Sequence, residues 1–297
     1  MKKILTITGI LAALIVIVIL IFVLTFKPQQ YSDFGIFTNL RTYVITTLKD
    51  YSATERPITQ DFSEFTLAIS FPFNKVFGSD VIAVPLQSFE SDTLGVATIS
   101  QFEVPPDSSY YRDFTLHIRP QYGLRAPVFH IDFMKPAPGT PGMCSMDFFN
   151  PDKDNIPLKE FLGEELENIQ KAVTLVERYQ RTVEEGRGKI TGYLDPYKSE
   201  YRCELLEPQT DDAALREKYY TTVAEAFKLF FHAYLTAVHK LERDTGYAQA
   251  HEEKTKDLVR LFYENDFAVS LGKRVFKEHF KKYWLDGFWN VQVTLED

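Results

Sequence analysis

Two different periods of hydrophobic residues divide the chain. Between about residues 65 and 149, short runs rich in β-branched and aromatic residues alternate with turns that contain glycine, proline and aspartate. The connections are too short for helical crossovers, so the pattern predicts an antiparallel meander of about six strands. We expect these strands at residues 65–71, 81–86, 94–104, 110–118, 128–134 and 143–149.

After Leu158 the hydrophobic residues recur at steps of three to five, which is typical of helices. We expect the later helices at residues 211–243, 248–263 and 269–284. Strands followed by helices predict an α+β domain, in which one antiparallel sheet is covered by helices. We place this domain at residues 63–297, after a linker with a short helix at 28–62.

Residues 4–26 form an almost unbroken aliphatic segment. At a helical rise of 1.5 Å per residue it would reach about 34 Å, enough to span a bilayer. No pair of small residues marks a cleavage site after it, so we predict an uncleaved, single-pass membrane anchor at residues 1–27. The flanking positive charges are nearly balanced and do not fix which side the domain faces, although they favour the outside.

Composition narrows the range of chemistry. The chain has 33 Lys and Arg against 41 Asp and Glu, a net charge of −8, which argues against a nucleic-acid-binding surface. Its two cysteines, Cys144 and Cys203, are too few for a thiolate metal cluster and leave one disulfide open. No metal, acyl-transfer, phosphate-loop or dinucleotide motif occurs, so we predict no bound metal or cofactor.

Titratable residues follow the alternation of the central strands. His130 and Asp132 are two apart and therefore share one face of their strand. We expect the neighbouring strands to bring His117 and Glu103 to the same side of the sheet. A carboxylate and an imidazole in a partly dry pocket have pKa values near neutrality and can donate protons. The plainer interpretation stays open, with a hydrogen-bonded structural aspartate and ordinary core histidines.

Two blocks of sequence resemble the ferredoxin-dependent bilin reductases. The first is IRPQYGLRAPVFHID at residues 118–132, followed by MDFFNP at 146–151, and it is similar to the central strands of that family. The second is AQAHEEKT at residues 248–255 with FKEHFKKY at 276–283, and it is similar to the C-terminal stretch of the family. The resemblance implies an α/β/α sandwich.

The resemblance also assigns roles to single residues. Asp132 matches the central-strand aspartate thought to protonate the bilin, and Glu253 matches the aspartate of the C-terminal motif, a second proton donor. Lys254 matches the lysine that can meet a propionate group. Glu103 stands where the phycocyanobilin-forming members have a glutamate.

Two positions depart from the family pattern. Thr115 stands where some members have a catalytic histidine, and His117, two residues further along, is a substitute on the same face. His130 replaces a small residue, so it narrows the pocket or adds a proton donor or a haem-iron ligand.

The family's activity is then the expected function. These reductases bind an open-chain tetrapyrrole without metal or flavin and take electrons singly from ferredoxin. The resemblance therefore implies an oxidoreductase that reduces a bilin with ferredoxin electrons and with protons from active-site carboxylates. The alternative is a catalytically inactive, membrane-anchored domain that binds a tetrapyrrole or another protein.

Overall fold

The computed structural model of the chain describes residues 36–58, 66–68, 81–83, 86–104, 111–135, 141–180, 192–266, 269–270, 273 and 278–294. The predicted membrane anchor at residues 4–26 lies outside these residues. None of the helices within them is both long and apolar enough to cross a membrane.

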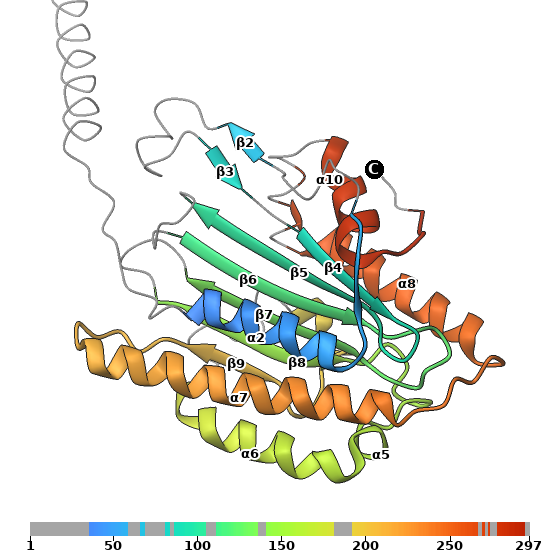
Figure 1. The fold of residues 1–297 in the computed structure, drawn as a ribbon, viewed down its shortest axis with the longest axis horizontal. Helices are drawn as coiled ribbons and strands as arrows, with labels where there is room; N and C mark the ends of the chain where they lie inside the picture. The colour runs from blue at the N-terminus through green and yellow to red at the C-terminus, as the bar shows by residue number, and fades with distance from the viewer. Residues whose placement is uncertain are drawn as a thin grey trace, which may run out of the picture.

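An antiparallel sheet forms the centre of the fold (Figure 1). Its main path runs β1-β4-β5-β6-β7-β8-β9, and β3 joins β2 to β5 beside that path. Six of these strands, from β4 to β9, follow each other in chain order, which confirms the predicted meander. The strands are β1 (Thr54–Arg56), β2 (Thr66–Ala68), β3 (Val81–Ala83), β4 (Leu86–Ser91), β5 (Gly95–Val104), β6 (Tyr111–Arg119), β7 (Val128–Lys135), β8 (Met143–Phe149) and β9 (Cys203–Leu206).

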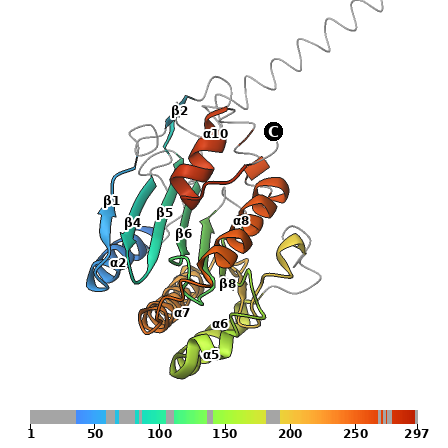
Figure 2. The same ribbon diagram turned by 90° about the vertical axis from the view of Figure 1, so that its right-hand side faces the viewer.

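Helices cover both faces of the sheet, as the view in Figure 2 shows. One layer contains α2 (Ile36–Asp50), α5 (Leu158–Leu162), α6 (Leu166–Val176) and α7 (Ala213–His239). The other contains α8 (Ala248–Asn265), α10 (Glu278–Lys282) and the π-helical η4 (Tyr283–Trp289). The predicted α/β/α sandwich is confirmed. Single 3-10 turns complete the elements: η1 (Gly163–Glu165), η2 (Glu177–Tyr179) and η3 (Gly192–Leu194).

The face of the sheet towards α2, α6 and α7 is a hydrophobic core. Phe129 and Phe148 point into it from β7 and β8, and neither is exposed to solvent. Their rings pack against α7, at 5.1 Å from Phe129 to Tyr234 and 5.4 Å from Phe148 to Phe230 between centroids. Each buried ring contributes about 1.5–3 kcal/mol by leaving water, so this layer supplies much of the stability.

The expected linker at residues 28–62 contributes two elements to the domain. The buried residues Phe37, Leu40, Val44 and Leu48 lie on one side of α2, and Phe37 contacts Phe133 of β7 edge to face at 5.4 Å. Further along, β1 pairs with β4. The described part of this segment therefore belongs to the sandwich.

The two cysteines lie on neighbouring strands, both are buried, and the disulfide that the sequence left open is not formed. Cys144 of β8 pairs in register with Leu205 of β9, and Cys203 pairs with Met146. Burial raises the pKa of the Cys144 thiol well above its usual value. Both side chains therefore act as small apolar groups of the core.

Truncating the core ring of Phe148 tests this account. We expect Phe148→Ala to lower the free energy of unfolding by about 3–5 kcal/mol, because it removes a fully buried ring and leaves a cavity. Urea unfolding followed by circular dichroism measures the change. Leu215→Ala is the control, since Leu215 is 49% exposed and its loss should cost less than about 0.5 kcal/mol. Equal effects of the two variants would contradict the assignment of the core.

Candidate functional site

The opposite face of the sheet is polar although helices cover it. Successive cross-strand partners point to the same side of a sheet, so each row of partners forms one line across the strands. We call the first line the histidine row, and it consists of Ser88, Thr98, His117, His130 and Asp147. We call the second the carboxyl row, and it consists of Ser100, Thr115, Asp132 and Ser145.

Aromatic residues of the C-terminal helices lie over the histidine row. The ring of His117 lies 3.8 Å from that of Trp289 and stacks on Phe288 at 5.4 Å between centroids. Phe262 of α8 lies 6.3 Å from His130. His117 is thus enclosed between the sheet and the segment η4, whereas His130 lies beneath α8.

Two carboxyl groups meet beside the carboxyl row. Thr115 Oγ1 lies 3.4 Å from Oδ1 of Asp113 and 3.4 Å from Oδ1 of Asp132, so the threonine joins them. Burial raises the pKa of Asp113 well above the usual aspartate range, and the nearby charge of Asp132 raises it further. Burial also raises the pKa of Asp132. Two carboxyl groups this close do not both ionise readily, so the pair holds a proton that it can donate.

The carboxyl pair is more accessible than the buried histidine. Asp113, Asp132 and Thr115 keep part of their surface exposed, although the protein around them removes most of their hydration. His117 is only 1% exposed. A small molecule that reaches this face therefore meets the carboxyl pair before it meets His117.

Both histidines are neutral at physiological pH. Burial lowers the pKa of His117 well below its usual value and lowers that of His130 to about 4. Their rings lie 5.9 Å apart on neighbouring strands. A neutral imidazole offers one donor and one acceptor, so the pair can form hydrogen bonds to a ligand of mixed polarity. Within the described residues no cluster of three or more His, Cys, Asp or Glu could hold a metal ion.

Glu103 lies near the end of β5, where its backbone pairs in register with Arg112 of β6. Its side chain lies outside the part of the chain that the structure describes. The predicted place of Glu103 beside His117 therefore stays a prediction.

Glu253 lies on the outer side of α8, whereas Lys254, three positions from His251, lies at the edge of the buried side. The buried side of that helix carries His251, Thr255 and Leu258, and a residue two positions from His251 points about 200° away from it. The side chain of Glu253 is 57% exposed and pairs with Lys256 at 3.0 Å, while Lys254 pairs with Asp152 at 3.7 Å. The predicted convergence of Glu253 with Asp132 is therefore wrong.

Two acids of the polar face were missed as site residues. Asp113 shares a face with the candidate histidine of its own strand, and Asp147 lies between the apolar residues Met146 and Phe148 of β8. Oδ1 of Asp147 accepts hydrogen bonds from the backbone N–H of Phe148 at 2.7 Å and of Ser199 at 3.0 Å. Burial raises the pKa of Asp147 to about 6. An acid between apolar residues of a predicted strand was the signal in the sequence.

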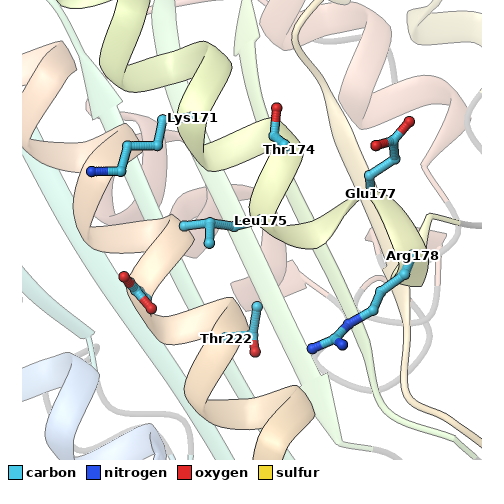
Figure 3. Close-up of a pocket in the computed structure, with 7 residues that line it drawn as sticks. Lys171, Thr174, Leu175, Glu177, Arg178 and Thr222 are labelled. Atoms are coloured by element: carbon cyan, nitrogen blue, oxygen red, sulfur yellow. The ribbon is translucent and has the colours of Figure 1, made fainter.

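A separate hollow of about 580 Å³ opens on the far helical layer (Figure 3). It lies between α6, η2 and α7, so the hydrophobic core and the sheet separate it from the polar face. Its lining is Lys171, Thr174, Leu175, Glu177, Arg178, Thr222 and Glu225.

Comparison with known proteins identifies the fold. No family model matches the chain, and no curated protein matches it. Among solved structures, the chain is similar to phytochromobilin synthase from tomato, crystallised in complex with biliverdin. The TM-score is 0.63 at 14% sequence identity, over 87% of this chain and 86% of the other. At this identity the likeness shows a shared fold.

The raised pKa of Asp113 predicts how stability depends on pH. Folded Asp113 binds its proton more tightly than unfolded Asp113, so its contribution is complete below the usual value of 3.8 and is lost as the pH rises through the raised folded value. Asp113→Asn keeps the shape and removes the ionisation. We expect its free energy of unfolding to fall less than that of the wild type from about pH 4 to pH 8.

Urea unfolding at each pH measures this difference. Glu253→Gln is the matched control, because it replaces an exposed carboxylate and should follow the wild-type curve. Parallel curves for Asp113→Asn and the wild type would show that Asp113 ionises freely in the folded protein.

Proposed function

We propose that the chain binds an open-chain tetrapyrrole over the polar face of its sheet and reduces it. The carboxyl pair carries the proposal, because two aspartates with raised pKa values lie side by side on a partly accessible surface. The shared fold with a protein crystallised with biliverdin supports the ligand class. The sequence blocks that resemble bilin reductases lead to the same class.

The chemistry suits the residues present. Reduction of one double bond of a bilin adds two electrons and two protons. Ferredoxin would supply the electrons one at a time, so the protein's task is to deliver protons to the right carbon atoms. Positioned groups with raised pKa values do this as general acids, typically worth about 10²–10⁴ in rate.

Each residue then has a proposed role. Asp132 and Asp113 share the transferable proton, and Thr115 keeps their oxygen atoms together. His130 and His117, both neutral, form hydrogen bonds to the ligand. Phe262 and the aromatic residues of η4 supply the apolar surface that a flat conjugated molecule requires.

Biliverdin provides the direct test. The full-length chain should shift the visible spectrum of biliverdin on binding and consume it when reduced ferredoxin is added. We expect Asp113→Asn and Asp132→Asn each to slow consumption by about 10²–10⁴, while each still binds biliverdin.

The exposed acid of α8 is the matched control for these two variants. Glu253→Gln should keep wild-type activity, because Glu253 is paired with Lys256 on the outer side of the helix. Wild-type rates in both aspartate variants would remove the carboxyl pair from the mechanism. Loss of activity in Glu253→Gln alone would move the acid to α8.

The second candidate is a domain that binds a tetrapyrrole without reducing it. The packing of Trp289 on His117 favours this, because it closes one end of the polar face. Thr115 at the position of a family histidine agrees with it. A biliverdin spectrum that shifts on binding but stays constant with reduced ferredoxin would support this candidate over the reductase.

We also propose that residues 4–26 anchor the chain in a membrane. A ferredoxin-dependent enzyme needs its domain on the same side of that membrane as ferredoxin. A reporter fused to the C-terminus should therefore be active on the ferredoxin side. A reporter active only outside the cytosol would contradict the reductase and leave the binding domain.

A further inference from the structure

The histidine row contains buried polar atoms that lack partners among the described residues. They are Oγ of Ser88, Oγ1 of Thr98, both ring nitrogens of His117, Nδ1 of His130 and Oδ2 of Asp147. Buried polar atoms are normally paired, and each exception calls for an explanation. Two of these atoms, Nδ1 of His130 and Oδ2 of Asp147, belong to neighbouring residues, because His130 and Asp147 are direct cross-strand partners on β7 and β8.

Asp147 is firmly held at its other oxygen. Its Oδ1 accepts from Ser199 Oγ and from the backbone N–H groups of Ser199 and Phe148. These bonds fix the carboxylate and leave Oδ2 as its one unpaired oxygen. Opposite residues of an antiparallel pair have Cβ atoms about 4.5–5.5 Å apart. A small rotation of the His130 ring, or one bridging water, is therefore enough to join its Nδ1 to Oδ2 of Asp147.

We propose that Asp147 is the positioning residue of His130: its Oδ2 pairs with Nδ1 and selects which nitrogen of the imidazole presents a proton to the polar face. When Asp147 is ionised, Nδ1–H donates to Oδ2 and Nε2 is an acceptor. When Asp147 is protonated, its O–H donates to Nδ1 and the proton of the ring moves to Nε2. His130 stays neutral throughout.

Other groups around the pair set the pH at which this exchange occurs. Burial raises the pKa of Asp147 to about 6, while the hydrogen bonds from Ser199 and the charge of Arg202 act to lower it. Around His130 lie His117 on β6 and Asp132 on its own strand. From α8, Phe262 contacts His130, and Asp266 at the end of that helix accepts from Tyr193 at 2.7 Å.

The tautomer of His130 affects ligand binding, and this part of the inference rests on the proposed function. A bilin presents pyrrole and lactam N–H groups along its inner edge, which match Nε2 as an acceptor. We expect biliverdin to bind about two- to tenfold more tightly above the titration of Asp147 than below it. Asp147→Asn should abolish this dependence.

Nitrogen-15 spectra of the ligand-free, full-length chain test the inference directly. The chain has 6 histidines, so selective labelling gives few signals, and His130→Gln assigns one of them. We expect the His130 tautomer to change with a midpoint near pH 6, in step with Asp147. The change should be absent in Asp147→Asn and should move to higher pH in Ser199→Ala, which loses a hydrogen bond to the carboxylate.

Glu207→Gln is the matched control. It replaces a buried carboxylate beside the other end of β8, where Glu207 accepts from the backbone N–H of Gly142. It should leave the tautomer change intact.

A single tautomer from about pH 5 to pH 8, or a change that persists in Asp147→Asn, would overturn the inference. If this occurs while biliverdin still binds, the proposed function stands without it. If the tautomer changes as expected but biliverdin does not bind at any pH, the inference on His130 stands and the ligand class fails.

Discussion

The structure depends on the alternation of side chains along β6 and β7. On one side of these strands, Phe129, Phe133 and Leu116 pack into a dry core. On the other, His117 is buried, and Asp113, Asp132 and His130 lose most of their hydration to the protein around them. Burial of unpaired polar groups opposes folding, and the hydrophobic core on the first side of the sheet offsets that cost. A polar layer beneath helices is the kind of exception to consistent packing that is expected at functional sites.

The period of the sequence was enough to predict the layers and most of the elements. The alternation of side chains along a strand predicted that His130 and Asp132 share a face, and the short connections between strands predicted the meander. The strand β4 was missed. The strands β1 and β9 were missed as well, because three or four residues hold too little pattern to be recognised. Their existence depends on partners that are distant in the chain.

The error at the C-terminal motif is an error of phase. Glu253 was placed in the right helix, yet its buried side is fixed by what packs against it, here Thr255 and Leu258. Asp147 was overlooked because the apolar residues around it read as a core strand. A motif match assigns a residue to an element, and only packing decides where that residue points.

Access to the polar face differs along its length. The segment η4 is tied to the sheet at two points, since Arg119 Nε donates to the carbonyl of Trp289 at 3.2 Å and Tyr283 shares a hydrogen bond at 3.2 Å with Ser100 of the carboxyl row. A ligand that reaches His117 must therefore displace Trp289 and break into this anchored segment. Asp113 and Asp132 keep part of their surface exposed although η4 contacts the carboxyl row at Ser100. Under the proposed function a ligand therefore meets the carboxyl pair first, and full engagement of the histidine row requires movement of η4.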